Sequence, residues 1–510
     1  MDGLNTTIII ICVAIYFAIS VVVGVYFKRR AEKGVGEFYV AGRSIPGMIV
    51  ALGYYSTFLS TATFIGQAGA SYKTGMPWVY VGMIWVAFCV FSWLVIAPRL
   101  RAQTEALGSI TATDYFDYRF NSKTLRVLGA AIAVFAQLFY LTSIVVGCAW
   151  IFKYALGVSY EVGAAILLLV TLIYLVTSGA WSVYYTDALQ GVLMLVASVL
   201  LFALVIAMSG GIGPALAALS NCPDPLPSGG TIGDKMMTWA LVSPLYVFSI
   251  GFSVGAKQIS DPKVTTRLYS IKDKKALRTA TIWAPIFLLI TSLVVFPLGA
   301  FAHAIIPTDK ALFYFKNTDQ VVPYILTLIE NPYIVGFIVA GWFAAAMSSI
   351  SPAVLAAATQ ITRDIFQITS KRAAAWSEKT IINLTRAFIV LYMLIVLVIS
   401  IYPPYGIVEL TAYTGSVFAS AFAPGVLGGL LWRRATKMGV LTSMLTGLIV
   451  TGVWRFWVIP AFPWIYNVYW IHEVIVGFIS SIIVFIAVCL VTKPPPDEIV
   501  NKAMLARLRS

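Results

Sequence analysis

Two adjacent serines lie in the middle of a long apolar stretch, where a hydroxyl group without a partner is costly to bury. The stretch 341–352, GWFAAAMSSISP, places Ser348, Ser349 and Ser351 directly after three alanines and a methionine. A single serine in an apolar helix commonly donates to the carbonyl one turn earlier, which is the purely structural interpretation. Small residues also allow a second backbone to approach, and neighbouring hydroxyl oxygens are ligands for a hard cation. The pattern therefore fits both interpretations, and the cation site requires that another segment supply the remaining oxygens.

The composition is that of a polytopic membrane protein. Of the 510 residues, 60% are hydrophobic and only 11% are charged. A membrane-spanning helix needs about 20 apolar residues, and because the apolar runs are continuous rather than alternating, they exclude a barrel of strands. We expect an all-α protein in one transmembrane domain, 1–510, with about thirteen helices. These are 7–27, 46–72, 77–98, 125–151, 160–177, 182–209, 236–256, 279–303, 332–361, 384–402, 406–431, 438–459 and 472–491.

The distribution of Lys and Arg predicts the orientation in the lipid bilayer. If the N-terminus is outside, the cytoplasmic segments hold 29 of the 35 Lys and Arg residues, seven of them in 257–278. This asymmetry follows the positive-inside rule. We therefore expect an outside N-terminus and an exposed cytoplasmic tail at 493–510, and we read the net charge of +14 as topology rather than as a nucleic-acid surface.

Two of the apolar runs carry interruptions that a plain span would not have. Five hydroxyl residues fall within Ser56–Thr63, and glycine and serine interrupt 248–255. Irregular backbone at membrane depth is tolerated only where it lines a cavity or a site. The interrupted runs open two sets of five helices, 46–209 and 236–431, and because five is odd the second set must be inverted. Such a pair predicts a binding site at the interface of the two repeats.

One carboxylate, Asp187, lies against an apolar core at the start of the sixth run. An ionisable residue at such depth is a functional candidate. The structural alternative is a position at the start of a helix, where a carboxylate is favoured by the helix dipole.

Five motifs occur in the order found in the sodium:solute symporter family. They are EFYVAGRSIPG, the Ser/Thr-rich second run, TATDYFDYRF, YTDALQG and AAAMSSIS. The resemblance covers about residues 7–435. It implies a five-plus-five inverted repeat of the leucine-transporter type, with a cation site between the second and ninth helices.

The same resemblance implies that Na⁺ is the coupling ion. Its implied ligands are the backbone carbonyls of Ser56, Leu59 and Ala345 and the hydroxyls of Ser348 and Ser349. A shell of five oxygens without a carboxylate suits a monovalent cation that must also be released. Asp187 matches the family's aspartate on the ion's route or at an additional site. Some members form a second sodium site with the next serine pair, but here Ser351 is followed by Pro352, and we expect a single coupled cation.

The solute pocket implied by the resemblance lies beside the cation. Its implied lining is Ser60, Thr63, Gln67, Gln137, Phe248 and Phe252. Members that carry proline have an aspartate where this chain has Phe58, which argues against proline, and helices two to six offer no core-facing arginine to bind a carboxylate. We expect a small organic solute, which leaves carboxylates, amino acids and vitamins open, and no obligate protein partner.

Other classes of protein fit less well. An intramembrane enzyme needs paired aspartates, a Ser–His pair or a histidine cluster, and the two histidines lie near helix ends. A channel needs a repeated filter or a charged ring, and a sensor needs a signalling domain. A proton-coupled symporter is the alternative, although the implied ligand shell contains no titratable group. We therefore expect a sodium-driven symporter of the cell membrane that works by alternating access, and not an enzyme.

Overall fold

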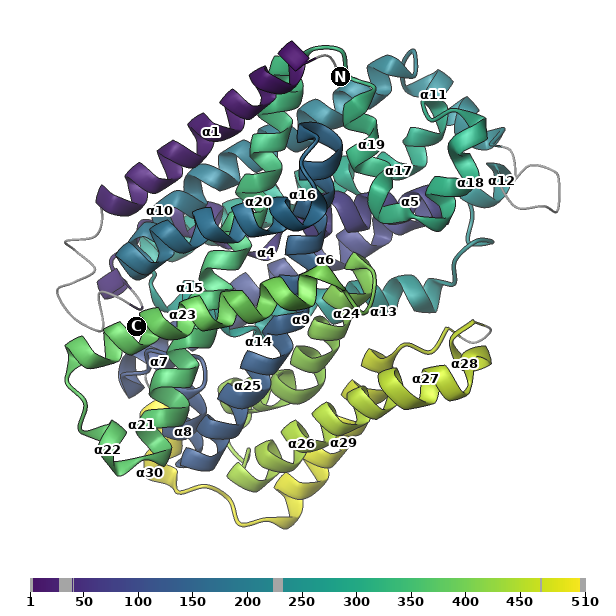
Figure 1. The fold of residues 1–510 in the computed structure, drawn as a ribbon. Coiled ribbons are helices and arrows are strands. Elements are labelled where there is room, and N and C mark those ends of the chain that lie inside the picture. Colours follow the sequence, from purple (N-terminus) through teal and green to yellow (C-terminus); the bar gives the residue numbers. More distant parts are fainter. Residues whose placement is uncertain (1–2, 27–38, 40, 223–232, 468–469, 505–510) are drawn as a thin grey trace.

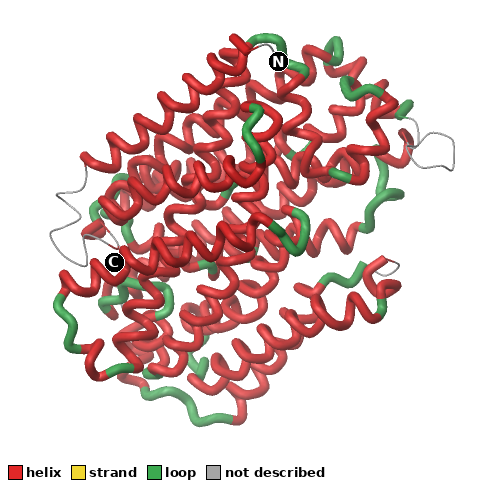
Figure 2. Tube along the Cα trace, in the orientation of Figure 1, coloured by secondary structure: helices red, strands yellow, loops and turns green. Residues whose placement is uncertain are grey.

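The structure is a computed structural model that describes residues 3–26, 39, 41–222, 233–467 and 470–504. Helices joined by short connections make up this part of the chain, and within it the only strand-like pairing is an isolated bridge between Ile45 and Ile271 (Figure 2). The long apolar helices are α1 (Gly3–Tyr26), α6 (Val79–Phe91), α9 (Lys123–Leu156), α10 (Tyr160–Met208), α16 (Lys274–Val295), α20 (Pro332–Thr359), α23 (Glu378–Ile401), α24 (Ile407–Val417) continued by α25 (Ala423–Leu431), α26 (Lys437–Val453) and α29 (Glu473–Val491).

The number of membrane-spanning helices differs slightly from the expected thirteen. Within the described residues, ten helices are long and apolar enough to cross a bilayer, and one bent pair brings the count to eleven. The expected helices 160–177 and 182–209 are joined in α10 without a non-helical loop, because no proline interrupts the segment between them. The expected helix 236–256 is present in shorter form as α13 (Pro244–Gly255). The all-α membrane fold predicted from the sequence is confirmed.

The second expected span is broken, as its hydroxyl residues predict. It consists of α4 (Gly47–Phe58), the π-helical turn η2 (Ala62–Gln67) and α5 (Ala68–Thr74). The two halves meet at 57°, and Leu59 between them is extended, with ψ 144°. Local hydrogen bonds replace the helical ones here, because the Ser60 N–H donates to Oγ1 of Thr63 (3.4 Å) and the Ala62 N–H donates to Oγ of Ser60 (3.2 Å). Short hydroxyl side chains commonly compete with a helix in this way.

The helix that opens the second repeat is also broken, but later than the sequence predicts. After α13 the chain continues through α14 (Lys257–Ser260) and α15 (Pro262–Tyr269). The break lies at Asp261, with ψ 121°, and not within 248–255. A residue that precedes proline is disfavoured in helical conformation, so Pro262 rather than the upstream glycines sets the break. The Asp261 carboxylate caps α15 by accepting from the Lys263 N–H at 3.1 Å.

Helix α20 lies in the interior and carries the two serines. It packs against α1, α4, α9 and α10 (Figure 1). Its small residues permit close contact: a Cβ added at Gly341 would lie 2.5 Å from Cβ of Ala197 on α10. The serines are thereby held against α4 rather than facing lipid.

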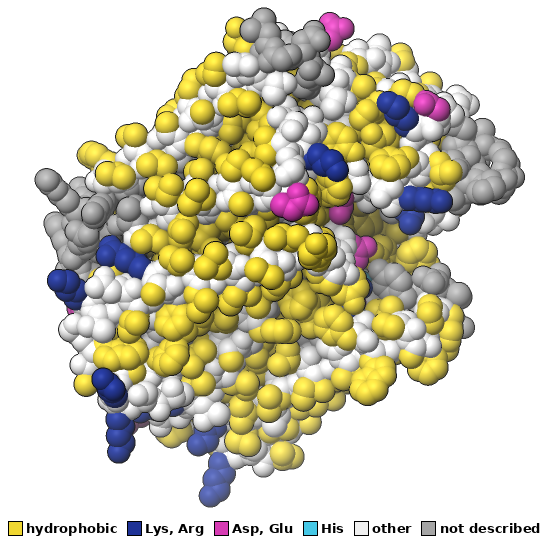
Figure 3. All heavy atoms as spheres, in the orientation of Figure 1, with side chains coloured by type: hydrophobic (Ala, Val, Ile, Leu, Met, Phe, Trp, Pro, Cys, Tyr) yellow, Lys and Arg dark blue, Asp and Glu magenta, His cyan; other side chains and the backbone are white. Residues whose placement is uncertain are grey.

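The surface is consistent with a membrane protein. Figure 3 shows a broad area of hydrophobic side chains, with Lys and Arg gathered toward the lower left and a mixed group of charges toward the upper right. Aliphatic side chains such as Val398 on α23 and Ile483 on α29 are largely exposed, as expected for helices that face lipid.

Two expectations about charged segments need correction. Three of the seven basic residues assigned to the cytoplasmic segment 257–278, Lys257, Lys263 and Arg267, are buried in the protein with at most 2% exposure. The tail is not simply exposed either, because α30 (Asp497–Met504) packs on α7 (Ala97–Leu107) and α8 (Asp114–Phe120) and buries an apolar face. Both differences have the same reason. A short polar segment is expected to be solvated, and the sequence does not show which distant residues will pack against it.

Candidate cation and solute site

The two serines of α20 meet the broken end of α4. The Ser348 hydroxyl donates to the carbonyl of Ser56 at 2.9 Å and lies 3.1 Å from the carbonyl of Ala345. The Ser349 hydroxyl lies 2.8 Å from the carbonyl of Leu59. All five residues are fully buried. The structure therefore brings together every oxygen that the family resemblance implies for the cation.

The carbonyls are available because α4 ends where it does. A helix leaves the carbonyls of its last turn without amide partners. The amide of Ser60, which would otherwise bond to Ser56, donates to a side chain instead. The Ser349 hydroxyl also lies 3.1 Å from the carbonyl of Thr57, so its one donor hydrogen is shared among more acceptors than it can satisfy.

The chemistry of this oxygen cage fits a hard monovalent cation. It consists of three carbonyls and two hydroxyls, and a hydroxyl can either donate or present its lone pairs to an ion. Among the described residues there is no group of three or more His, Cys, Asp or Glu side chains that could hold a metal. A sodium ion would bind to the carbonyl oxygens that here accept hydrogen bonds from the serine hydroxyls.

Asp187 lies beside the cage but is not part of it. Its carboxylate forms a buried ion pair with Arg267 of α15. Arg267 also donates to Oγ1 of Thr57 at 2.8 Å, which links the pair to the last turn of α4. The sequence identified the aspartate and missed its arginine, because Arg267 follows the second break in a segment read as a cytoplasmic loop.

Ser351 is not brought into the cage. Its hydroxyl donates to the Met347 carbonyl one turn earlier, at 2.7 Å. This is the bond that the structural interpretation predicts for a serine in an apolar helix.

Four of the six expected solute residues lie near the cage and the two breaks. Ser60 and Thr63 form the break of the second span. Gln67 accepts from the Trp78 indole at 3.1 Å, and Gln137 of α9 donates to Asp261 at 2.7 Å. Each glutamine also has one buried polar atom, Nε2 of Gln67 and Oε1 of Gln137, that finds no hydrogen-bond partner among the described residues. Such atoms are suited to a polar ligand.

The other two expected solute residues point elsewhere. Phe252 packs its ring on Phe88 of α6 and on Phe478 of α29, with centroids 5.4 and 4.9 Å apart. Phe248 lies one turn earlier on the same face and is 46% exposed. Residues four apart share one face of a helix, and this face of α13 packs on α6 and α29.

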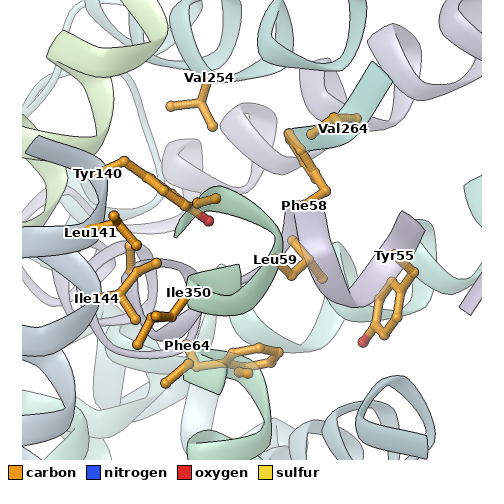
Figure 4. Packing of buried hydrophobic residues seen from close by; sticks show 14 of the residues in the cluster. Tyr55, Phe58, Leu59, Phe64, Tyr140, Leu141, Ile144, Val254, Val264 and Ile350 are labelled. Atoms are coloured by element: carbon orange, nitrogen blue, oxygen red, sulfur yellow. The ribbon is translucent and has the colours of Figure 1, made fainter. Parts of the chain in front are cut away.

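Several polar residues that the sequence did not assign to the site also lie here. Tyr140 of α9 donates to Ser349 at 3.2 Å, and Figure 4 shows it pointing inward from α9 toward Leu59. The Lys257 and Lys263 ammonium groups lie 3.6 and 3.8 Å from the centre of its ring. Lys263 also donates to the Thr57 carbonyl at 3.0 Å. One feature of the sequence could have indicated these residues: Asp261 lies between Lys257 and Lys263, next to Pro262 and after a glycine-interrupted helix.

Cavities lie on either side of this region. One of about 620 Å³ is lined by residues of several spans and of the connections between them, including Lys73, Trp78, Asp319 and Glu409. Burial, and then the neighbouring Glu409 carboxylate, raises the pKa of Asp319 to about 7. A second cavity, of about 50 Å³, is lined by residues that include Arg267. Because Trp78 also bonds to Gln67, the larger cavity adjoins the first repeat's contribution to the site.

An oxygen cage between a broken helix and a small-residue helix, inside an all-α membrane fold, is characteristic of an ion-coupled secondary transporter. Sequence comparison gives the family: the sodium:solute symporter family matches residues 38–447, and the chain belongs to it. A sodium/proline symporter of Staphylococcus aureus (strain JH9) is 28% identical over 500 residues, which are 95% of this chain and 93% of the relative. The relative from strain NCTC 8325 / PS 47 matches equally.

Solved structures show the same fold. A Na⁺-coupled sialic acid symporter in a substrate-bound, outward-open state superposes with a TM-score of 0.75 at 18% identity, over 96% of this chain and 99% of that one. Mhp1, a nucleobase-cation-symport-1 family transporter in a closed conformation with bromovinylhydantoin bound, gives 0.53 at 13% identity, over 92% and 98%. The expected leucine-transporter-like fold and sodium-coupled symport are confirmed, and the protein is a transporter rather than an enzyme.

Proposed function

We propose that this protein moves one sodium ion together with one small organic solute, by alternating access, and that the cage of Ser56, Leu59, Ala345, Ser348 and Ser349 binds the ion. The observation that carries the proposal is the contact of both serine hydroxyls with carbonyls freed by the break in α4. These oxygens belong to segments almost 300 residues apart, so a change in their separation would couple ion binding to movement of one repeat against the other.

We further propose that the protein resides in the cell membrane with its N-terminus outside and its C-terminus in the cytoplasm. Family membership and the apolar helices support the membrane setting. The orientation rests on the basic residues, and all 29 lie in the segments assigned to the cytoplasm. Among those that the structure describes, five are buried in the protein: Arg119, Arg126, Lys257, Lys263 and Arg267. Cysteines introduced in those segments should react with an impermeant maleimide only after the membrane is opened.

The solute named for the S. aureus relatives is proline. Family members that carry proline have an aspartate at the position of Phe58. In this chain the Phe58 side chain is buried, and its ring centroid lies 5.4 Å from that of Trp85. It offers no polar group to an amine. Phe58 therefore argues against proline, which is included in the panel of solutes to be tested because the relatives are named for it. A small carboxylate, another amino acid or a vitamin also fits the proposed function.

The cage is tested by removing its hydroxyls. In proteoliposomes with an inward sodium gradient, Ser348→Ala and Ser349→Ala should each raise the sodium concentration for half-maximal solute uptake by about tenfold, because one of five ligands is lost. Ser351→Ala is the matched control, a serine on the same helix that bonds to its own backbone, and its sodium dependence should stay unchanged.

Two outcomes would contradict this. Unchanged sodium dependence in both cage variants would remove the serines from the site. Equal uptake driven by a proton gradient in sodium-free buffer would favour the proton-coupled alternative over sodium.

A further inference from the structure

A cluster of charged and polar side chains is buried next to the oxygen cage. It consists of Gln137, Tyr140, Lys257, Asp261 and Lys263, hereafter the lysine cluster, and each of these residues is at most 1% exposed. The cluster lies at the break of the second repeat and touches the break of the first, because Lys263 donates to Thr57 at the end of α4. Nothing in the sodium cage itself requires two lysines at this place.

The charges of this region do not balance. The lysine cluster and the adjoining Asp187–Arg267 pair contain three cations, Lys257, Lys263 and Arg267, and two carboxylates, Asp187 and Asp261. One positive charge is therefore in excess. A buried charge without a counter-ion is strongly unfavourable, and an ionisable residue inside a membrane protein commonly marks the path of a substrate.

The excess charge is shared by Lys257 and Lys263, because the Asp261 carboxylate acts on both ammonium groups. Asp187 is paired with Arg267, and Asp261 lies 3.8 Å from the Lys257 ammonium. Among the residues that the structure describes, Lys263 forms no salt bridge, and its ammonium bonds to the Thr57 carbonyl and lies over the Tyr140 ring. An ammonium has three donor hydrogens, so Lys263 can bond to an anion without giving up Thr57.

The same ammonium is close to the proposed sodium ligands. The Thr57 carbonyl oxygen lies 3.0 Å from Nζ of Lys263 and 3.1 Å from Oγ of Ser349. A sodium ion in the cage would therefore lie next to a positive charge inside the protein, where charges interact strongly. An anion bound to Lys263 would relieve this repulsion.

From this arrangement we infer that Lys263, together with Lys257, binds the carboxylate of a solute with one net negative charge, and that this contact is what couples the solute to sodium. The inference rests on the proposed sodium cage. Each ligand then raises the affinity for the other, and by thermodynamic linkage the two factors are equal. Oε1 of Gln137 and Nε2 of Gln67, which have no hydrogen-bond partner in the described part of the chain, are available for the polar remainder of the solute. A zwitterion such as proline brings a second positive charge to a region that already has one in excess.

Sodium titrations of the purified protein test the inference. Thermal unfolding is followed while sodium replaces choline at constant ionic strength, with acetate, propionate, lactate or pyruvate, with acetamide and lactamide as uncharged counterparts, or with proline. At least one of these monocarboxylates should lower the sodium concentration for a half-maximal shift by about tenfold or more. Its amide and proline should not.

Variants assign this effect to the lysine. Lys263→Met should abolish the carboxylate effect and, in the absence of solute, should lower the sodium concentration for a half-maximal shift several-fold, because the repelling charge is gone. A purely structural role would predict weaker sodium binding instead. Lys263→Arg keeps the charge and should keep the carboxylate effect. Lys379→Met, an exposed lysine on α23, is the matched control and should behave as wild type.

The outcomes separate the inference from the proposed function. If sodium shifts the unfolding temperature but no monocarboxylate changes the sodium dependence, or if proline or an amide acts instead, the inference is wrong and the cage stands. A carboxylate effect that persists in Lys263→Met also overturns it. If sodium produces no shift under any condition, the proposed cage fails and the inference fails with it. Should Lys263→Met not yield folded protein, Lys257→Met must weaken the carboxylate effect at least threefold, or the inference is wrong.

Discussion

Thr57 shows how single residues connect the parts of this site. Its carbonyl accepts from Ser349 and Lys263, and its hydroxyl accepts from Arg267, which also pairs with Asp187. The residue thus joins the oxygen cage to a buried ion pair between α10 and α15. Because buried polar networks gain their strength from complete pairing, the conformation of the last turn of α4 depends on charges that are far away in the sequence.

The buried ion pair gives a prediction at this scale. Asp187→Asn leaves Arg267 charged and unpaired, and should lower the free energy of unfolding by about 3–5 kcal/mol, the usual cost of breaking a buried pair. Adding Arg267→Gln removes the unpaired charge and should recover part of the loss. Thermal unfolding of the single and double variants in detergent measures both effects. Strictly additive losses would show that the two side chains do not act as a pair.

At the scale of elements, the site depends on two broken helices and one close helix contact. The break of α4 frees the carbonyls, and the break at Asp261 turns the lysines of α14 and α15 inward. Helix α20 holds its serines against α4 from the other side, and it can do so because it packs closely on α10 through Gly341. A larger separation of α10 and α20 would displace both serines.

Gly341→Ala tests this contact. The added Cβ would lie 2.5 Å from Ala197, closer than carbon atoms can approach, and such overpacking should destabilise the protein by about 1–3 kcal/mol. Gly213→Ala on α11 (Ile212–Ser220) is the matched control, because no atom of the described residues outside the immediate helix backbone lies within 4 Å of its added Cβ. Alanine is the better helix former by about 1 kcal/mol, so the control should be neutral or stabilising. Shifts of the same sign and size would argue against close packing at Gly341.

For the whole molecule, the charge moved in each cycle decides how far a solute can be concentrated. One charge crossing 100 mV gains about 2.3 kcal/mol, and a tenfold sodium gradient gains about 1.4 kcal/mol. One sodium ion with a zwitterion could therefore accumulate solute several-hundred-fold. One sodium ion with a monoanion is electroneutral, and only the roughly tenfold chemical gradient acts on it.

Electrical recordings distinguish these cases. If one sodium ion accompanies one monocarboxylate, proteoliposomes on a solid-supported membrane should show no sustained solute-dependent current, and an imposed potential of 100 mV should leave uptake unchanged. A sodium-driven uptake of radiolabelled solute in the same vesicles is the positive control. A current of one charge per solute would indicate either a zwitterionic solute or a second sodium ion.

The sequence by itself determined the features that depend on local chemistry. Continuous apolar runs require helices in a membrane, and the hydroxyl residues of Ser56–Thr63 compete with their own helix, so the all-α fold and the first break were predictable. The adjacent serines Ser348 and Ser349 were also identified as candidates for the cation. They stand out because the residues around them are small or apolar, and Ser351 is the only other residue of 341–352 with a side-chain oxygen.

Only the tertiary structure decided which side of each element faces the site. Periodicity shows that Phe248 and Phe252 share a face of α13, but not that this face covers α6 and α29. The basic segment that begins at Lys257 reads as a cytoplasmic loop, because a lysine is expected to remain in water. Its burial depends on Thr57, Tyr140 and Asp187, which are more than 60 residues away in the sequence, and such contacts exist only once the two repeats have packed together.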